Sequence, residues 1–272
     1  MGAKVPLVFS ILFAFGCQNP TKVVEKEKRE FERSYSHQQI VTSSTRRPMR
    51  LIWNGSPQAQ PVLFVHGSPG ESSNWAHFLI NKDLSQKYYM LSVDRPGYGG
   101  SGGGRTEPSL INQADDILSA IRFIDRPVIL VGHSLGVPVV AQMARLQPQK
   151  VKGLVLVAGA VDPSLEKIKW FQYPAKWKIF SWLVPDPLRV CNEEIFPLEK
   201  ELERLSLEWP LIEIPTVIIH GRKDNLVPIE NVDFLKKKMQ PKWVRNIVLV
   251  DDLNHFVPWK RPDLIINAIE SF

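Results

Sequence analysis

The chain has 272 residues, of which 44% are hydrophobic and 23% are charged, and its formal net charge is +6 at pH 7. This composition is typical of a globular protein with a substantial core and excludes disorder of the whole chain. The two cysteines give no disulfide framework, and no Cys/His cluster has the spacing of a zinc site. The sequence has no stripe of basic residues interleaved with aromatic residues, which is the pattern that would indicate a nucleic-acid partner. The sequence therefore predicts one large or two small globular domains without nucleic acid or metal.

The first 17 residues, MGAKVPLVFSILFAFGC, form an apolar segment that ends at Cys17. One lysine precedes about a dozen apolar residues, which is the size of a signal-peptide core and too short for a mature transmembrane helix. The Gly16–Cys17 junction resembles a bacterial lipoprotein signal, in which the cysteine is lipidated, although Ala14 and Phe15 depart from the usual pattern. We therefore expect a protein of the bacterial cell envelope, tethered to a membrane through Cys17. An N-terminal membrane anchor and a cytoplasmic protein are the alternatives.

After this segment, residues 18–48 are polar and charged and are predicted to form a linker. From residue 49 onward, short apolar runs alternate with helical patterns. Strands are predicted at 49–53, 61–67, 88–94, 127–132, 151–159, 215–221 and 245–252, and helices at 109–124, 134–147, 229–239 and 262–271. Strands that are apolar throughout are typical of a parallel sheet covered by helices on both faces. The predicted fold class is therefore α/β, with a mostly parallel central sheet in a core of residues 49–160 and 214–272.

Residues 161–213 interrupt this alternation between two core strands. Pro174 and Pro185 punctuate two short helical segments, and 193–207 is predicted to be a third helix. We expect a small helical cap over one edge of the sheet. Its aromatic side chains either pack the cap onto the core or line an apolar substrate pocket: Trp170, Phe171, Tyr173, Trp177, Phe180, Trp182, Phe196 and Trp209.

The motif GHSLG, residues 132–136, places Ser134 where an apolar strand ends and a helix begins. Larger side chains at 132 and 136 would collide with a sharp turn, so the two glycines fit a nucleophile elbow of the form G-x-S-x-G. Such a turn lifts the hydroxyl clear of the sheet and aims helix N-terminal amides at a developing oxyanion. A small residue in a tight corner is the alternative, but the strand–turn–helix placement favours a nucleophile.

A serine nucleophile needs a base, and the base needs an orienting acid. Asp224 lies just past a core strand, and His255 lies in the loop after the final strand. The order Ser134, Asp224, His255 is that expected for this architecture. Asp251 and Asp252 are the competing candidates for the orienting acid, and they lie closer to the end of the final strand than His255 does.

Donors for developing negative charge are also required in acyl transfer. The segment HGSPG, residues 66–70, follows a core strand and opens a loop, which is the right place for a backbone N–H from Ser68. The amide of Leu135 would be its partner in an oxyanion hole. A simple Gly/Pro turn is the alternative.

Five motifs follow one another along the chain: HGSPG (66–70), DRPGYGGS (94–101), GHSLG (132–136), GRKDNLVP (221–228) and NHFVPW (254–259). Over about residues 49–272 the chain resembles an α/β-hydrolase of the epoxide hydrolase-like branch. The resemblance implies a serine hydrolase in which Ser134 is the nucleophile, Asp224 the acid, His255 the base, and Ser68 with Leu135 the oxyanion hole. Epoxide hydrolases and haloalkane dehalogenases carry aspartate at the elbow, so serine favours ester or related hydrolysis.

The leading hypothesis is therefore hydrolysis of carboxylic esters with an apolar acyl or alcohol portion, through an acyl-enzyme and without a cofactor. A small-molecule ester or lipid is the expected partner, and the sequence leaves the oligomeric state open. The alternatives are a C–C bond hydrolase, a proline iminopeptidase-like enzyme and a non-catalytic ligand-binding module. The peptidase would need cap carboxylates to hold an amine, for which the candidates are Glu193, Glu194, Glu203 and Glu208.

Overall fold

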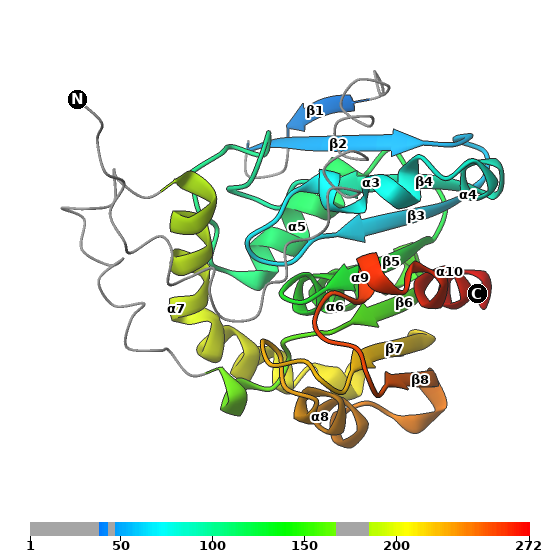
Figure 1. Cartoon of the computed structure of the whole chain (residues 1–272). Helices are drawn as coiled ribbons and strands as arrows, with labels where there is room; N and C mark the ends of the chain where they lie inside the picture. Colours follow the sequence, from blue (N-terminus) through cyan, green and yellow to red (C-terminus); the bar gives the residue numbers. More distant parts are fainter. Residues whose placement is uncertain (1–37, 43–46, 167–184) are drawn as a thin grey trace, which may run out of the picture.

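A computed structural model describes residues 38–42, 47–166 and 185–272 and is centred on one eight-stranded sheet (Figure 1). The strand order is β1-β2-β4-β3-β5-β6-β7-β8, with β2 antiparallel to both of its neighbours and all other adjacent pairs parallel. The strands are β1 (Gln38–Thr42), β2 (Pro48–Asn54), β3 (Gln60–Val65), β4 (Tyr88–Val93), β5 (Val128–His133), β6 (Val151–Val157), β7 (Thr216–Gly221) and β8 (Val244–Val250). The predicted α/β class with a mostly parallel sheet is confirmed.

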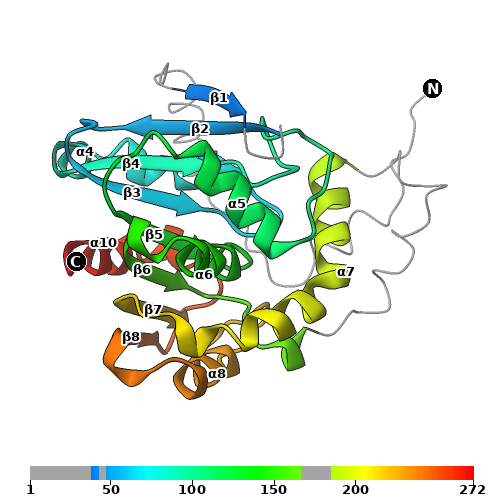
Figure 2. The ribbon, with the colours of Figure 1, turned by 180° about the vertical axis from the view of Figure 1, so that it is seen from behind.

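Helices cover both faces of the sheet (Figures 1 and 2). The α-helices are α3 (Ala76–Leu79), α4 (Lys82–Lys87), α5 (Leu110–Ala120), α6 (Gly136–Leu146), α7 (Asp186–Ser206), α8 (Glu230–Lys238), α9 (Val257–Lys260) and α10 (Pro262–Glu270). Short 3-10 helices are η1 (Ser72–Trp75), η2 (Pro148–Lys150), η3 (Pro163–Leu165), η6 (Trp209–Leu211) and η7 (Pro241–Trp243). The predicted helices at 109–124, 134–147, 229–239 and 262–271 correspond to α5, α6, α8 and α10.

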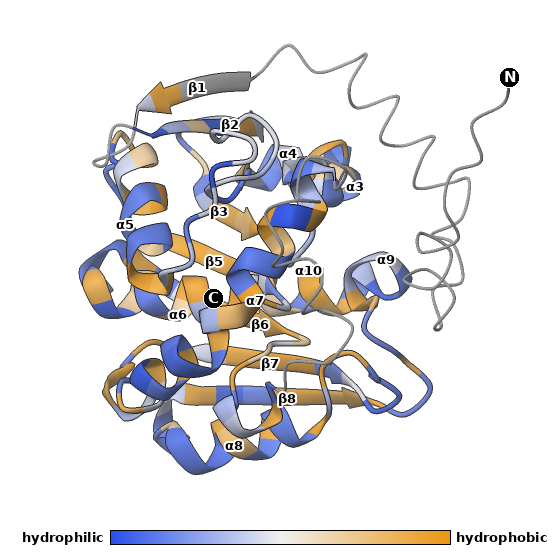
Figure 3. Ribbon diagram, turned by 90° about the vertical axis from the view of Figure 1, so that its left-hand side faces the viewer, coloured by the Kyte–Doolittle hydropathy of each residue, from blue (hydrophilic) through white to orange (hydrophobic). Residues whose placement is uncertain are grey.

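Two apolar cores lie on opposite faces of the sheet because the central strands are buried on both sides. One core packs α5, α6, α7 and α8 against side chains such as Leu63 and Leu130. The other packs α3, α9 and α10 against the alternate side chains, such as Phe64 and Val131. Figure 3 shows the inner strands β3, β5, β6 and β7 as mainly hydrophobic, whereas the helices around them carry both hydrophobic and hydrophilic residues. Consecutive residues of one strand therefore belong to different cores, which explains the unbroken apolar runs in the sequence.

The sheet begins earlier than the sequence predicts. β1 lies inside the segment 18–48 that was expected to be a linker, and it pairs antiparallel with β2, from Gln38 opposite Ile52 to Thr42 opposite Pro48. An edge strand has one neighbour only, so it needs no continuous apolar run and leaves little signal in the sequence. The signal-like segment with Cys17 and the first part of the expected linker lie outside the described residues.

The described part of the cap consists of η3, α7 and η6. α7 begins at Asp186, earlier than the predicted start at 193, and it continues through Pro197. It stands beyond the carboxyl ends of the parallel strands (Figures 1 and 2). Trp209 is fully buried in the core cluster, so this aromatic residue packs the cap onto the domain. Phe196 is half-buried, and the other aromatic residues of the predicted cap lie outside the described residues.

Candidate active site

Ser134 occupies a strained turn between β5 and α6. Its φ is 54°, and Ala158 is the only other non-glycine residue with positive φ in the described part of the chain. A Cβ on Gly136 would come within 2.4 Å of the Val65 carbonyl oxygen, and one on Gly132 within 2.7 Å of the Gly136 carbonyl oxygen. Both glycines of the motif are therefore required by close backbone approach, and the turn has the geometry of a nucleophile elbow.

Asp224 and His255 are joined directly. His255 Nδ1 donates to Asp224 Oδ2 at 2.7 Å, and the amides of Leu226 and Val227 donate to Asp224 Oδ1, each at 2.9 Å. Burial favours a neutral carboxyl, but these donors outweigh it and hold the pKa of Asp224 below its usual range. An ionised Asp224 fixes the histidine tautomer with the proton on Nδ1, which leaves Nε2 as an acceptor.

His133 connects the loop of His255 to the elbow. It directly precedes Ser134, and its Nε2 donates to the His255 carbonyl oxygen at 3.1 Å. The two imidazole rings lie 4.7 Å apart between centroids. Ser134 and His255 are thus carried by adjoining segments, although no hydrogen bond joins their side chains among the residues described. Such bonds often form only when substrate is bound.

The loop with Ser68 lies against the same turn. A Cβ on Gly67 would come within 2.8 Å of the Ser134 Cβ, so glycine allows the two backbones to approach closely. In the described part of the chain, neither the Ser68 amide nor the Leu135 amide donates a hydrogen bond. Leu135 is nearly fully buried, and an unpaired buried amide is costly unless a ligand uses it. Gly67, which precedes Ser68, and Leu135 thus lie at the Ser134 turn, and the amides of Ser68 and Leu135 make no hydrogen bond within the described residues.

The competing carboxylates are engaged elsewhere. Asp251 is highly exposed and pairs with Arg222 at 2.9 Å, and Asp252 is also exposed. Among the cap candidates for an amine site, Glu194 is buried against Arg95 at 2.8 Å. Glu193 and Glu208 form exposed or half-exposed pairs with Arg189 and Arg145, and Glu203 is exposed.

Arg95 and Tyr98 belong to the site region and were missed as functional residues. Both lie in the motif DRPGYGGS, and both are almost completely buried. Arg95 donates to the carbonyl oxygens of His66 and Gly67 at 2.9 and 3.0 Å, and Tyr98 contacts Ser68 Oγ at 2.6 Å. The signal available in the sequence was an arginine directly after a buried strand, next to a glycine-rich loop.

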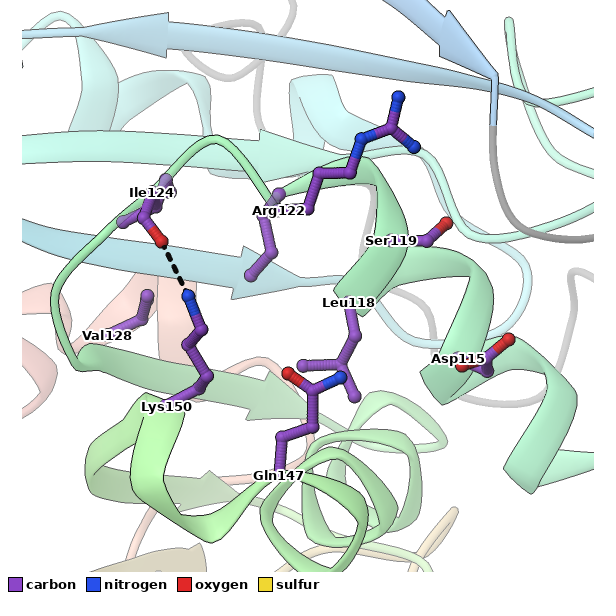
Figure 4. Close-up of a pocket in the computed structure, with 9 residues that line it drawn as sticks. Asp115, Leu118, Ser119, Arg122, Ile124, Val128, Gln147 and Lys150 are labelled. Atoms are coloured by element: carbon purple, nitrogen blue, oxygen red, sulfur yellow. Dashed lines mark hydrogen bonds between the residues drawn. The ribbon is translucent and has the colours of Figure 1, made fainter.

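A surface pocket of about 260 Å³ lies away from this constellation (Figure 4). It is enclosed by the end of α5, the end of α6 and the following loop, near Val128 and Lys150. Val128 begins β5, whereas Ser134 follows its end, so the pocket lies at the amino end of this strand and Ser134 at its carboxyl end. Within the described ranges, no group of three or more His, Cys, Asp or Glu side chains is arranged to hold a metal ion, and no helix is long and apolar enough to cross a membrane.

A model of the alpha/beta hydrolase family matches residues 62–268. The chain belongs to this family. It is therefore a hydrolase by fold and family, and the predicted resemblance is confirmed.

Relatives of this hydrolase carry several activities. It is 32% identical over 178 residues to the mitochondrial palmitoyl-protein thioesterase ABHD10 of Bos taurus, covering 61% of this chain and 58% of the relative. The chain thus spans little more than half the length of that relative. It is 25% identical to proline iminopeptidase PfmaB of Pestalotiopsis fici, covering 80% of this chain and 92% of the relative. A bacterial membrane phospholipase A superposes with a TM-score of 0.67 at 19% identity, covering 97% of this chain and 94% of that structure, which shows the shared fold.

Buried neutral histidines predict that acid destabilises the hydrolase. Burial lowers the pKa of His66 well below its usual value, that of His133 to about 3 and that of His220 below its usual value. Below about pH 6.5 these histidines bind protons in the unfolded chain but stay neutral in the folded chain. The free energy of unfolding therefore falls by at most about 1.4 kcal/mol per pH unit for each histidine. Urea unfolding between pH 7 and pH 5 measures this slope.

The matched variant is His220→Gln, whose side-chain amide can replace the bond from His220 Nε2 to the Val227 carbonyl oxygen. It should unfold with a shallower dependence on pH than the parent chain. A stability that stays constant or rises on acidification from pH 7 to pH 5 would contradict the prediction.

Proposed function

We propose that this chain is a serine hydrolase that cleaves carboxylic esters with an apolar acyl or alcohol portion. The observation that carries the proposal is the strained Ser134, set beside two unpaired backbone amides and a histidine already bonded to a buried aspartate. Each component of acyl transfer is then supplied by this chain: a nucleophile, a base with its orienting acid, and donors for the oxyanion.

In the proposed mechanism, Ser134 Oγ attacks the ester carbonyl carbon while His255 Nε2 accepts the hydroxyl proton. Asp224 stabilises the resulting imidazolium, and the amides of Ser68 and Leu135 bind the oxyanion. His255 then donates the proton to the leaving alkoxide, which departs as the alcohol. Water, deprotonated by the same histidine, hydrolyses the acyl-enzyme and regenerates Ser134.

The choice of substrate class rests on the cap and on the relatives. The sequence of the cap is rich in aromatic residues, which suit an apolar acyl group. The resemblance to a palmitoyl-protein thioesterase supports an acyl substrate, and an oxygen ester or a thioester presents the same carbonyl to Ser134.

An iminopeptidase-like activity is the second candidate because of the resemblance to PfmaB. That activity needs a free carboxylate for the substrate amine. Glu194, the buried candidate in the cap, is instead neutralised by Arg95, which favours the esterase. The non-catalytic module is an outcome of the same substrate test, and a diketone-like substrate added to the panel tests the carbon–carbon hydrolase.

We further propose that the enzyme works at a membrane of the bacterial cell envelope. The support is the apolar segment that ends at Gly16–Cys17 and the polar stretch that follows it. Several acyl chains on Cys17 would anchor the protein far more firmly than one chain, which gives only marginal binding. A tether of that kind would bring the acyl site close to lipid substrates.

Replacing Ser134 tests the nucleophile and the reaction class together. The parent chain should hydrolyse p-nitrophenyl esters and react covalently with a fluorophosphonate, and Ser134→Ala should lower kcat by about 10⁶-fold and abolish labelling. Proline p-nitroanilide should be a poor substrate. Steady-state rates and labelling of both proteins measure this.

The contrary outcomes separate the alternatives. A folded Ser134→Ala variant with near-normal ester hydrolysis would remove the serine from the mechanism. Faster hydrolysis of the proline amide than of every ester would establish the iminopeptidase instead. No turnover with tight retention of an acyl ligand would indicate the binding module.

Asp224→Asn tests the acid. The amide keeps the size of the side chain but no longer enforces the Nδ1–H tautomer of His255, so kcat/KM should fall by about 10⁴-fold. Asp251→Asn removes an exposed carboxylate from the same region and is the matched control, with activity expected to stay within twofold. The reverse pattern, an active Asp224→Asn and an inactive Asp251→Asn, would reassign the acid.

Cys17→Ser tests the membrane tether. Bacterial cells that produce the full chain are grown with an alkyne fatty acid, which should label the parent chain and not the variant. The membrane fraction should contain the parent, and the variant should be depleted from it. An unlabelled parent chain that keeps its N-terminal methionine would overturn the lipid anchor.

A further inference from the structure

A buried arginine joins the cap to the loop that carries Ser68. The side chains of Arg95 and Glu194 are 0% and 1% exposed. Nη1 of Arg95 lies 2.8 Å from Glu194 Oε1, and Nη2 lies 3.1 Å from Oε2. Gln113 Oε1 accepts a further bond from Nη1 at 2.7 Å. Because the pair is bidentate and its charges are balanced, the arginine is held in one orientation.

The same guanidinium fixes the peptide group between Gly67 and Ser68. Arg95 Nη2 donates to the Gly67 carbonyl oxygen at 3.0 Å, and His66 Nδ1 donates to it at 2.7 Å. The peptide group is planar and trans, so its N–H, which belongs to Ser68, points opposite to this carbonyl. Two donors on the carbonyl therefore set the direction in which the Ser68 amide points.

His66 is itself oriented by Arg95. The backbone amide of Arg95 donates to His66 Nε2 at 2.9 Å, which leaves the proton on Nδ1, where it reaches the Gly67 carbonyl. Burial lowers the pKa of His66 first, and the nearby Arg95 charge lowers it further, so the imidazole stays neutral in this tautomer. Arg95 thus acts twice on the Gly67–Ser68 peptide group: its side chain donates to the Gly67 carbonyl directly, and its backbone amide orients the His66 ring that donates to the same carbonyl.

The cap contributes Glu194 to this arrangement. Glu194 lies on α7, and its Oε2 also accepts bonds from Ser68 Oγ at 2.9 Å and from Tyr98 OH at 2.8 Å. One carboxylate therefore contacts the arginine, the loop that carries Ser68 and the loop after β4. Undocking of α7 would leave the charge of Arg95 buried without its partner, which is strongly unfavourable.

We propose that Arg95 is a positioning residue for the oxyanion hole, and that Glu194 makes this positioning depend on docking of the cap helix α7. The inference rests on the proposed function, since it assigns the Ser68 amide to the oxyanion. Hydrogen bonds from a cation to the Gly67 carbonyl polarise the peptide and strengthen its N–H as a donor. The side-chain hydrogen bonds of Arg95 go to His66, Gly67, Gln113 and Glu194 and not to Ser134, so its contribution acts through the direction and donor strength of the Ser68 amide.

A merely structural ion pair would behave differently on replacement. Exchanging a buried ion pair for apolar side chains of similar volume is often neutral or stabilising. The double variant Arg95→Met/Glu194→Met therefore removes the Arg95 donor to the Gly67 carbonyl, leaves the His66 donor in place, and leaves no lone buried charge. The matched control is Arg145→Met/Glu208→Met, which removes a partly exposed pair that links α6 to the segment after α7.

The experiment compares four proteins: the parent, the two double variants and Arg95→Lys. The midpoint of urea unfolding, kcat and KM for a p-nitrophenyl ester, and the inhibition constant of a trifluoromethyl ketone are measured for each. The ketone forms a tetrahedral adduct whose oxygen occupies the oxyanion hole, so its affinity reports on the hole directly.

The double variant at 95 and 194 should keep an unfolding midpoint close to that of the parent and a KM within threefold. Its kcat should fall about 10- to 100-fold, and its affinity for the ketone should fall in parallel, because a misaligned donor loses part of its contribution. Arg95→Lys keeps the charge but not the forked geometry, so it should show the same loss of kcat in a smaller degree. The control pair should leave both kinetic readouts unchanged.

Parent-like kcat and ketone affinity in the double variant would overturn the positioning role and leave only a structural ion pair. Should that variant not fold, Arg95→Lys decides alone, and unaltered kcat and ketone affinity in this variant would overturn the inference. Failure of the parent chain itself to turn over esters or bind the ketone would instead remove the proposed function. The parent and the variants therefore report the two failures separately.

Discussion

The backbone of Ser134 is held in a conformation that most side chains avoid, and the surrounding elements are arranged to hold it there. A positive φ outside glycine costs roughly 1–3 kcal/mol and persists only where its neighbours leave no alternative. Here the Ser134 amide donates to the Val157 carbonyl at the end of β6, and the Val137 amide donates to the Ser134 carbonyl as α6 begins. The end of β6 and the start of α6 therefore fix the backbone that carries the hydroxyl.

Two buried acid–base pairs converge on this turn from different sides. One joins Asp224 after β7 to His255 after β8, and its ionised carboxylate selects the histidine tautomer. The other joins Arg95 after β4 to Glu194 on α7, and it reaches the peptide before Ser68. The Asp224 carboxylate and the Arg95–Glu194 pair carry buried charges, and their partners and hydrogen bonds must balance the cost of burial. The site thus combines groups from the carboxyl ends of several parallel strands, where binding sites of open α/β sheets occur.

Much of this arrangement is predictable from local sequence patterns. The apolar strands, the turn at Ser134 and the positions of Asp224 and His255 follow from rules that act over a few residues, and the fold brings these residues to one end of the sheet. β1 was not predicted because an edge strand needs no apolar repeat in its sequence. α7 begins at Asp186, earlier than the predicted start at 193, because Pro185 was expected to punctuate the helical segments, whereas in the structure it directly precedes the helix.

The Arg95–Glu194 contact could not be predicted from local sequence patterns for a different reason. The two residues are 99 positions apart, and each one alone resembles an ordinary solvated charge. Only tertiary packing shows that Glu194, a candidate for binding a substrate amine, faces the arginine instead. The lipid anchor at Cys17 lies outside the described residues and stays a prediction.

A crystal structure of the parent chain after reaction with a fluorophosphonate tests the central claim most directly. The account predicts phosphorus bonded to Ser134 Oγ, with one phosphonyl oxygen about 2.7–3.1 Å from the amides of both Ser68 and Leu135. An adduct on another residue, or one whose oxygen points away from both amides, would contradict it.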